Sequence, residues 1–481
     1  MSALFEKLAA APQRAILIFG LALMLSGNWL LPLTDRDETR FAEASREMLQ
    51  RHDYVVPWFN GAWRFDKPIL IYWCQSASYR VFGENPFAAR LPSAIFTTLT
   101  AWLLVRWGRK IADAKTALMA GGIFLLGLHV AIIGRVATAD MALVFFCTLA
   151  LWSGWELTRP EQPARKLCWG IFYVALALGF LAKGPVAWLP FGGVLLGRLF
   201  RKDSFRLPFL ATVAGLVVTL ALTAAWAIPA LQQTNGEFFK IGIGEHVVHR
   251  STGVNDGHGL AGILGFIATT PLYFLTFFVS FFPWSTKVPS ALKRWWPART
   301  SDGLGWYLLV QAGIVFAVFS CVRTKLPHYT MPAFACIALW LAREIAREQN
   351  SFAWFSQRLV AMAAFMAVLT LMLFPLAKPF LLTENLWREI KPLVQPQTKI
   401  GCFDFVESSL VWKFRSVATN TITLGPREQA ANFLTNPPPC ILILPTKDFA
   451  KLADTNGLIL SAHGLDMVKF KNWDMTIIVR E

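Results

Sequence analysis

Charged residues are scarce in this chain, and acidic residues are the scarcer kind. Only 16% of its 481 residues are charged, 55% are hydrophobic, and the mean hydropathy is +0.45. This balance excludes an ordinary water-soluble domain. The chain also lacks a long basic stripe, because its net charge of +16 is spread over short segments. Nucleic acid is therefore not an expected partner.

The seven cysteines form no CxxC pair and no zinc-ribbon spacing, which argues against a structural metal or a redox motif. Cys402 and Cys440 share the C-terminal region, each in an apolar, strand-like run. The sequence is compatible both with a disulfide between these two cysteines and with two buried thiols. The N-terminal apolar run, 15–33, lacks a small-x-small cleavage site, so we interpret it as a retained first span.

Apolar runs dominate what is present. About eleven of them are long enough to cross roughly 30 Å of hydrocarbon. They lie near 15–33, 88–107, 114–134, 138–157, 167–183, 186–200, 207–230, 260–283, 304–320, 327–345 and 355–377. Every second connection is basic, so the positive-inside rule predicts a cytoplasmic N-terminus. An odd number of spans then puts everything after about residue 378 outside the cytoplasm.

The expected fold is therefore an α-helical polytopic membrane protein with a small C-terminal α/β extracytoplasmic domain. Residues 1–377 form the membrane domain, and its long outer segments are 34–87 and 231–259. Residues 378–481 form the soluble domain, because apolar strand-like runs alternate there with helix-like stretches. Long loops often carry function.

The first outer segment opens with unusual charge. Thr34 and Asp37 approximate a capping box, and the stretch through Gln50 has the spacing of an amphipathic helix on the outer membrane surface. Asp37 and Glu38 fall where a span emerges, a position at which a carboxylate can become more basic. The alternative is that these charges form a solvated face.

Two further positions carry charge near the outer surface. Asp66 and Lys67 precede Pro68, which restrains them, so the pair either faces a pocket or forms a surface ion pair. Asp140 lies where the third and fourth predicted spans meet. A charge at membrane depth is usually functional, although Asp140 and Arg135 can also simply pair with each other.

Several cations lie on the outer side, which topology normally keeps poor in them: Lys183, Arg250 and Lys325. Lysine holds an anion as a point charge and arginine holds it as a fork. An anionic lipid phosphate or diphosphate is the natural partner, and a neutral substrate would not require these residues.

The order and spacing of these motifs from about residue 15 to 345 resemble the GT-C membrane glycosyltransferases of the protein-mannosyltransferase type. The bacterial 4-amino-4-deoxy-L-arabinose lipid A transferase group is the most similar. The resemblance rests on Asp37-Glu38-Thr39-Arg40-Phe41-Ala42-Glu43, Phe65-Asp66-Lys67-Pro68 with Tyr72-Trp73, Asp140, Lys183-Gly184-Pro185, Glu245-His246 and Lys325-Leu326-Pro327-His328-Tyr329.

The resemblance implies an inverting glycosyltransferase that takes its sugar from a polyprenyl (undecaprenyl) phosphate carrier. It implies that Asp37 is the catalytic carboxylate, and that Asp66 and His246 resemble a zinc site of that group. Two protein ligands would need water or phosphate to complete a tetrahedron. The tail departs from the group, whose members usually have two more spans before the soluble domain. The acceptor is therefore open.

We expect a monomeric, multi-pass protein of the bacterial inner membrane whose active site and C-terminal domain face the periplasm. The acceptor would be lipid A, another glycolipid, a glycan or a protein. Expected catalytic residues are Asp37, Glu38 and Asp140. Expected substrate-binding residues are Arg40, Asp66, Lys67, Tyr72, Lys183, Arg250, Lys325, His328 and Tyr329.

Two other classes of function compete with this one. A transporter or flippase of a lipid-linked sugar would share the spans and the cationic cavity, but such proteins typically show paired helix interruptions in their two halves. A non-catalytic scaffold that presents the tail to partners would leave the acidic outer segment unexplained.

Overall fold

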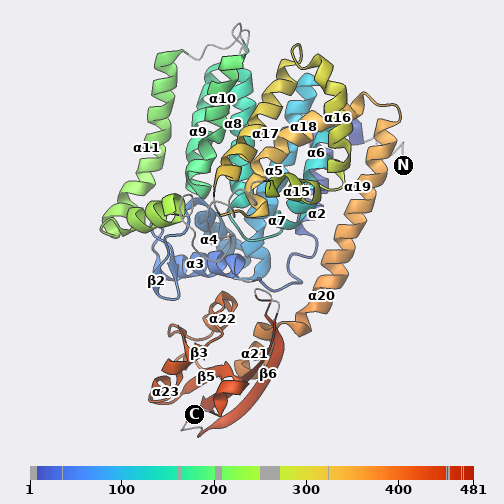
Figure 1. Cartoon of the computed structure of the whole chain (residues 1–481). Coiled ribbons are helices and arrows are strands. Elements are labelled where there is room, and N and C mark those ends of the chain that lie inside the picture. The colour runs from blue at the N-terminus through green and yellow to red at the C-terminus, as the bar shows by residue number, and fades with distance from the viewer. Residues whose placement is uncertain are drawn as a thin grey trace. The chain divides into compact units, whose positions relative to one another are not determined.

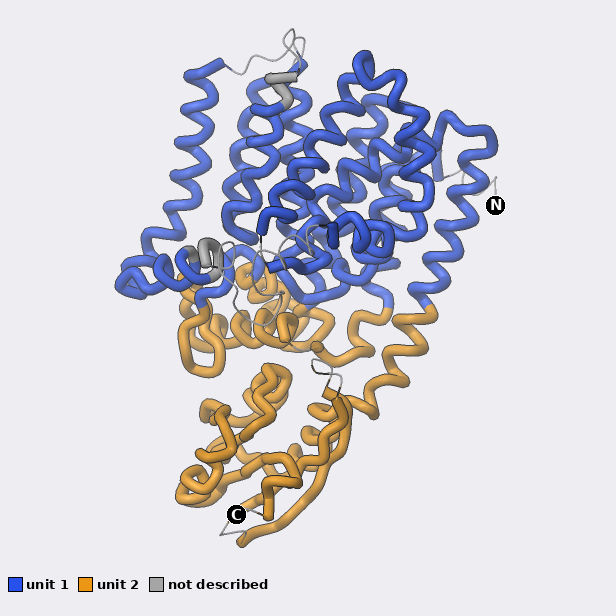
Figure 2. Tube along the Cα trace, viewed as in Figure 1, with its two compact units in different colours: residues 1–26, 65–71, 90–367 blue, residues 27–64, 72–89, 368–481 orange. Residues whose placement is uncertain are grey.

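The computed structural model describes residues 8–34, 36–159, 165–200, 208–249, 271–322, 324–450, 452, 456–466, 469 and 471–481. The chain divides into two compact units (Figure 2). Unit 1 comprises Met1–Ser26, Phe65–Ile71 and Arg90–Ala367. Unit 2 comprises Gly27–Arg64, Tyr72–Ala89 and Val368–Glu481. The predicted tail domain is thus part of a larger unit that includes most of the first outer segment.

Unit 1 is built from helices (Figure 1). The longer ones are α2 (Pro12–Leu25), α5 (Pro86–Ile111), α6 (Ala114–Leu125), α7 (Leu128–Ile133), α8 (Asp140–Leu157), α9 (Arg165–Lys183), α10 (Leu189–Phe200), α11 (Phe209–Gln233), α15 (Leu272–Ser280), α16 (Val288–Trp295), α17 (Gly303–Cys321), α18 (Pro332–Ala346) and α19 (Ser351–Val368). Further helical segments lie between them: η1 (Pro185–Trp188), α12 (Glu237–Phe239), η2 (Lys240–His249), η3 (Trp284–Lys287), η4 (Trp296–Ala298) and η5 (Pro327–Thr330).

Among the described residues, 6 helices are long and apolar enough to cross a membrane. They are Pro86–Ile111, Asp140–Leu157, Arg165–Lys183, Phe209–Gln233, Gly303–Cys321 and Ser351–Phe380. Shorter apolar helices occur at Pro12–Leu25, Ala114–Leu125 and Pro185–Leu196. All of these coincide with predicted spans, while the total of about eleven stays a prediction.

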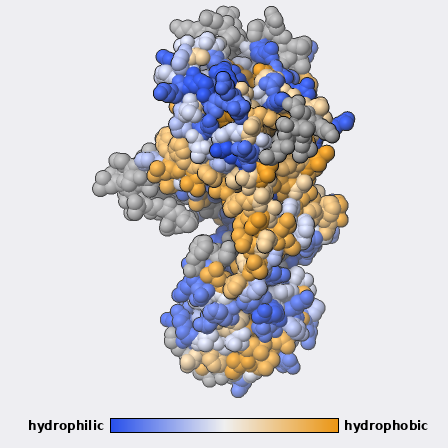
Figure 3. Space-filling view, turned by 90° about the vertical axis from the view of Figure 1, so that its right-hand side faces the viewer, coloured by the Kyte–Doolittle hydropathy of each residue, from blue (hydrophilic) through white to orange (hydrophobic). Residues whose placement is uncertain are grey.

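The surface of these helices suits a lipid environment. Hydrophobic side chains gather in patches on the face that the space-filling view presents (Figure 3). In α11, Phe209, Val217 and Leu220 are exposed, and in α19 so is Phe365. Lipid tails solvate such side chains without the penalty that water would impose.

The predicted span 114–134 is interrupted. Helix α6 ends at Leu125, and α7 begins at Leu128 after Gly127, whose backbone is extended (φ −62°, ψ 125°). The Leu128 amide then donates to the carbonyl of Phe282 at 3.0 Å. The periodic apolar pattern continues through this break, which is why the sequence indicates one helix where the structure has two.

Unit 2 contains α3 (Asp37–Arg51), the hairpin β1 (Trp58–Phe59) and β2 (Ala62–Trp63), most of α4 (Leu70–Phe82), and the C-terminal region. A linking stretch has η6 (Leu369–Leu373), α20 (Phe374–Ala377), η7 (Lys378–Phe380), α21 (Leu382–Ile390) and η8 (Lys391–Leu393). The C-terminal elements that follow are β3 (Lys399–Phe403), α22 (Ser408–Phe414), β4 (Thr423–Gly425), η9 (Arg427–Gln429), α23 (Ala430–Phe433), β5 (Cys440–Pro445), α24 (Thr446–Phe449), β6 (Leu458–Asp466) and β7 (Lys471–Arg480).

The C-terminal strands form one mixed sheet in the order β4-β3-β5-β7-β6. Strand β3 is parallel to β4 and β5, whereas β7 is antiparallel to β5 and β6. This sheet with its helices confirms the α/β character predicted for the tail. Cys402 and Cys440 are both free, buried thiols that pack in different hydrophobic clusters. They are therefore not bridged, and the buried-thiol alternative is correct.

Helix α3 differs from its prediction. Its N-cap is Arg36 without a side-chain cap, so the proposed Thr34–Asp37 capping box is wrong. Instead, the Glu38 carboxylate accepts hydrogen bonds from the Thr34 amide (2.9 Å) and hydroxyl (2.8 Å). Glu43 and Arg46, on the side opposite the predicted apolar face, are also buried. Four charges of α3 are thus buried rather than solvated, namely Glu38, Glu43, Arg46 and Glu47, whereas Asp37 is exposed.

Candidate functional site

Unit 1 encloses a cavity of about 550 Å³. Its wall is mostly apolar and aromatic, with Phe180, Trp226 and Phe319 among its rings. Its charged members are Asp66, Lys67, Asp140 and Lys183, joined by His328 and Tyr329. A concave, largely apolar cavity with a few convergent polar groups is the usual form of a ligand site. Six of the residues predicted for the site thus line one hollow.

The chain brings Asp140 and Lys183 together from two helices. Asp140 is the first residue of α8 and Lys183 the last of α9, and the Lys183 ammonium donates to the Asp140 carboxylate. The charges also suit these helix ends, because an acid is favoured at an N-terminus and a base at a C-terminus. Lys183 Nζ lies 5.3 Å from the centroid of the Tyr329 ring.

The turn after Lys183 depends on glycine. Gly184 has φ +79° and ψ −154°, a backbone conformation that residues other than glycine rarely adopt. It reverses the chain into η1, whose Pro185 and Val186 also line the cavity. The Lys183-Gly184-Pro185 motif therefore has a direct structural reason.

Asp140 does not pair with Arg135, which corrects one of the two interpretations of this segment. Arg135 is 6% exposed and donates to the backbone carbonyls of Ala131 and Leu23. These bonds tie α7 to α2. Arg135 is therefore a structural residue. Asp140 pairs with Lys183 and lines the cavity instead.

Asp66 and Lys67 approach the cavity from the connection between β2 and α4. Both line its wall together with Pro68 and the preceding Phe65. The Phe65 ring packs edge-on against Phe238 at 5.5 Å. The sequence left open whether this pair faces a pocket or forms a surface ion pair, and the structure agrees with the pocket. Their part in binding stays a prediction.

His328 and Tyr329 belong to η5 and pack against each other, with ring centroids 4.9 Å apart. The His328 ring is 6.4 Å from that of His129, and His129 Nδ1 is hydrogen-bonded to the Ser280 hydroxyl at 2.9 Å. His129 is not among the residues predicted for the site. Its signal was a lone ionisable residue in an apolar run, which often marks a functional position.

Lys325 has a different environment from the other cations. It is 7% exposed and its ammonium donates to the carbonyls of Ser320 (3.1 Å) and Val322 (2.7 Å). From this segment the cavity wall takes Thr324, His328 and Tyr329. Burial lowers the pKa of Lys325 from its ordinary value.

The remaining predicted residues of the described chain belong to unit 2. Asp37 is exposed in the first turn of α3, Glu38 is buried, and Arg40 is half-buried. Tyr72 is fully buried, accepts a hydrogen bond from Arg64 Nε at 3.3 Å and packs against Phe41. The carboxylates predicted as catalytic therefore fall in both units, Asp140 in unit 1 and Asp37 and Glu38 in unit 2.

The predicted metal site is only partly described. Asp66 lies in the cavity wall, whereas the side chain of His246, and Arg250 altogether, lie outside the described residues. Among the residues that are described, no three His, Cys, Asp or Glu side chains are grouped closely enough to hold a metal ion. The described donor set does not complete the coordination that zinc requires. We therefore assign no chemical step to a metal.

The sequence matches known proteins over its membrane region. Residues 66–228 match the model of the dolichyl-phosphate-mannose-protein mannosyltransferase family. An undecaprenyl phosphate-alpha-4-amino-4-deoxy-L-arabinose arabinosyl transferase of Pectobacterium atrosepticum is 33% identical over 330 residues, 67% of this chain and 56% of that protein. The chain thus spans a little over half the length of such relatives. An uncharacterized protein of Aquifex aeolicus is 30% identical over 341 residues, 70% of this chain and 74% of that protein.

The fold also matches solved structures. The crystal structure of ArnT from Cupriavidus metallidurans bound to undecaprenyl phosphate superposes with a TM-score of 0.79 at 16% identity, covering 96% of this chain and 97% of that one. Its apo form gives the same TM-score. The mycobacterial arabinofuranosyltransferase AftD is less similar, with a TM-score of 0.55 at 12% identity, covering 98% of this chain and 40% of that one. The helical fold and the C-terminal sheet are thus shared with ArnT.

Proposed function

Since this chain belongs to the GT-C membrane glycosyltransferases of the protein-mannosyltransferase type, we propose that it moves a sugar from undecaprenyl phosphate to an acceptor of the cell envelope. The reaction would take place at the periplasmic face of the bacterial inner membrane. Lipid A is the acceptor class that the resemblance to the 4-amino-4-deoxy-L-arabinose lipid A transferases implies.

The observation that carries this proposal is the composition of the cavity in unit 1. Lys67 and Lys183 line the cavity together with Asp66 and Asp140, and the rest of the wall is mostly apolar. Ammonium groups hold phosphate as point charges, and apolar side chains accommodate an isoprenoid chain without loss of solvation. A lipid phosphate satisfies both parts of the wall. The fold shared with an ArnT structure bound to undecaprenyl phosphate supports this assignment.

In the proposed reaction, the acceptor oxygen attacks the anomeric carbon of the sugar. The bond between this carbon and the phosphate oxygen breaks, and the pair of electrons leaves with the carrier phosphate. Negative charge therefore develops on the phosphate, where Lys67 and Lys183 would neutralise it. Asp140 orients Lys183 through their ion pair.

Asp37 would orient the acceptor and take its proton. Its carboxylate is exposed in the first turn of α3 and is therefore accessible to an acceptor. Single displacement inverts the anomeric configuration. If the acceptor is itself a phosphate, as on lipid A, its oxygen is already ionised near neutral pH and Asp37 would only position it. Arg40, Tyr72, Arg250, Lys325, His328 and Tyr329 complete the proposed substrate-binding set.

A divalent cation is a separate proposal. Asp66 and His246 would supply two ligands, and a phosphate or water would supply the others. Metal analysis of the purified protein, compared with the Asp66→Ala variant, tests it. A bound metal that is retained in this variant, or the absence of any metal, would contradict the proposal.

The experiment that tests the function uses purified protein in nanodiscs with undecaprenyl phosphate sugars and lipid A. We expect release of undecaprenyl phosphate that depends on the acceptor, together with a glycosylated acceptor seen by mass spectrometry. A flippase or transporter would move the lipid-linked sugar across the bilayer without releasing carrier. A scaffold would do neither, so either result would overturn the proposal.

A further inference from the structure

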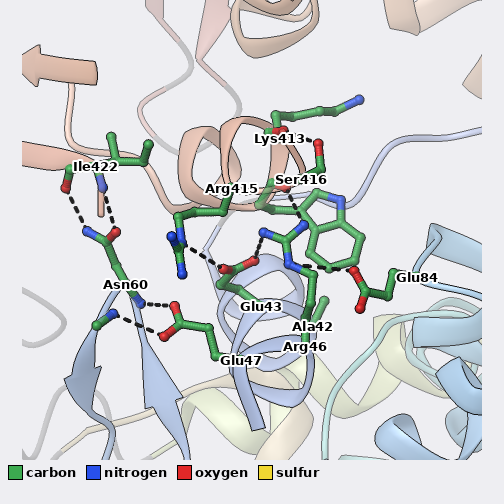
Figure 4. A network of polar contacts seen from close by, with 12 residues as sticks. Ala42, Glu43, Arg46, Glu47, Asn60, Glu84, Lys413, Arg415, Ser416 and Ile422 are labelled. Atoms are coloured by element: carbon green, nitrogen blue, oxygen red, sulfur yellow. Dashed lines mark hydrogen bonds and ion pairs between the residues drawn. The ribbon is translucent and has the colours of Figure 1, made fainter. Parts of the chain in front are cut away.

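Helix α3 carries a buried cluster of charges that joins it to the C-terminal region within unit 2 (Figure 4). Glu43 is 0% and Arg46 is 1% exposed. The two side chains form an ion pair one turn apart on α3. Arg46 also donates to the backbone carbonyl of Trp412 at 3.1 Å, and its guanidinium lies 4.8 Å from the centroid of the Trp412 ring.

A second arginine reaches the same carboxylate from the other side. Arg415, which follows α22 directly, places its Nε 3.9 Å from Glu43. The other end of the Arg415 guanidinium donates to the carbonyls of Thr419 (2.6 Å) and Asn420 (3.1 Å). Glu43 is therefore held between an arginine of its own helix and an arginine that is itself anchored in the C-terminal region.

Polar contacts between α3 and α22 continue at the start of both elements. Arg36, the N-cap of α3, lies 3.9 Å from Glu407, the N-cap of α22. The hydroxyls of Thr39 and Ser408 are hydrogen-bonded at 2.7 Å. These contacts flank Asp37 and Glu38, so the C-terminal region fixes the turn of α3 that carries the predicted catalytic carboxylates.

The hairpin after α3 is tied to the same region. The Asn60 side chain donates to the Ile422 carbonyl at 2.7 Å and accepts from the Ile422 amide at 2.8 Å. Its backbone amide and that of Gly61 donate to the Glu47 carboxylate. The C-terminal region thus holds the helix at its start, its middle and its end.

We propose that Glu43, Arg46 and Arg415 are positioning residues through which the C-terminal region aligns α3 for the transfer step. The proposal rests on the function proposed above, in which α3 carries the acceptor-activating Asp37. A buried ion pair is a poor way to gain stability, because its desolvation cost offsets most of its attraction. It is a good way to specify one relative placement of two elements, because misplacement leaves charges buried and unpaired.

The charge state of the cluster changes near neutral pH. Burial raises the pKa of Glu43 to about 7, against the opposing effects of Arg46 and Arg415. Glu47 on the same helix raises this pKa further. Tyr79 of α4 and Glu84 after it face the same cluster, where Glu84 lies 4.0 Å from Arg46. A role in alignment therefore has a signature in the pH profile, which a purely structural role would not have.

The test compares Arg415→Gln, Arg415→Lys and Glu43→Gln with wild type in nanodiscs, using an undecaprenyl phosphate sugar and lipid A. The control is Arg388→Gln, an exposed arginine of the same region that pairs with Glu389. For Arg415→Gln we expect kcat to fall by about 10-fold or more, because the buried Glu43 carboxylate loses one of its two cationic neighbours. The KM for the donor should change by less than about 2-fold, because the cavity belongs to unit 1.

The conservative variant and the pH profile complete the test. Arg415→Lys should recover part of the lost kcat. We expect wild type to show an inflection of kcat near pH 7, and Glu43→Gln should remove it. A folded Arg415→Gln protein with the kcat of wild type, an equal effect on donor KM, or an unchanged inflection in Glu43→Gln would each overturn the proposal.

Hydrogen exchange separates this proposal from the proposed function. Amides of Asp37–Arg51 should exchange at least about 10-fold faster in Arg415→Gln than in wild type, while those of α8 and α9 should not change. If wild type cleaves no lipid-linked sugar, the proposed function fails, and the exchange result still decides whether the cluster fixes α3. Unchanged exchange in α3 would overturn the coupling itself.

Discussion

Lys183 and Asp140 form an ion pair that joins the last residue of α9 to the first residue of α8 in the wall of the cavity. Their side chains are only 14% and 11% exposed. The pair therefore holds a cation at a fixed place in an apolar wall while no anion is bound. A lipid phosphate that enters the cavity would share this lysine with Asp140, so its positive partner is already in place before it binds.

Removing one partner of this pair should destabilise the protein and removing both should not. Lys183→Met leaves the Asp140 charge buried and unpaired, and we expect a loss of about 3–5 kcal/mol. Lys183→Met combined with Asp140→Asn should recover most of this loss and yet remain inactive, because the phosphate has lost one of its two proposed cations. Thermal unfolding and carrier release measure the two effects.

Lys110→Met is the control, because Lys110 is 41% exposed and its partner Glu156 still has an ion pair with Arg159 in this variant. Recovery of activity in the double variant would contradict the role of Lys183.

Asp37→Asn should abolish transfer without unfolding the protein. The side chain is exposed in the first turn of α3, so we expect a change in stability below about 1 kcal/mol, mostly from the helix dipole. Carrier release and the unfolding midpoint are measured on the same preparation. Asp474→Asn, at an exposed position of β7, serves as the comparison and should keep full activity. Turnover of Asp37→Asn at the rate of wild type would remove Asp37 from the mechanism.

Lys67→Gln should weaken donor binding and also slow the saturated reaction, because Lys67 would hold the bound phosphate and neutralise the charge that develops on it as it leaves. One charge-assisted contact to phosphate contributes about 1.5–3 kcal/mol, so we expect the donor KM to rise by about 10–100-fold. Titration with undecaprenyl phosphate gives the same quantity in the absence of a sugar. Lys293→Gln, an exposed lysine of α16, should change neither value. An unchanged KM in Lys67→Gln would place the phosphate elsewhere.

The stability of unit 2 should depend on pH through Glu43. Burial raises its pKa from 4.5 to about 7, so between these values the folded state binds more protons than the unfolded state. Stability is then greatest below about pH 4.5 and falls as pH rises through about 7, by about 3 kcal/mol at most. Hydrogen exchange of α3 between pH 5 and 8, corrected for the intrinsic rate, measures it. Glu43→Gln should flatten this dependence, and an equal slope in this variant would rule out Glu43 as its source.

The sequence predicted the cavity residues well, because each of them breaks a strong pattern. Asp140, Lys183 and His328 are ionisable residues at the ends of apolar runs, and such residues are costly unless they share a site. Asp66 and Lys67 precede a proline that restrains them. The structure brings all five to one cavity wall.

The surroundings of α3 could not be predicted from periodicity. An apolar stripe indicates one buried face, but it does not reveal that a distant segment covers the polar face as well. Arg46 and Trp412 are 366 residues apart in the chain, so no local pattern links them. Closeness in sequence was misleading for Asp140 and Arg135. It suggested an ion pair, whereas the Arg135 side chain donates to backbone carbonyl oxygens.

The discontinuity of unit 2 sets a rule for building hybrids between this chain and its longer relatives. The tail forms contacts with residues 27–64 and 72–89, so a swap made at a single junction near residue 368 would divide one compact unit. It would leave the Glu43 charge without its Arg415 partner and the Asn60 amide without its hydrogen bonds to Ile422. A graft that exchanges the three segments together keeps these partners matched. The natural modules of this protein are thus interleaved along the gene, and recombination experiments should cut it at those points.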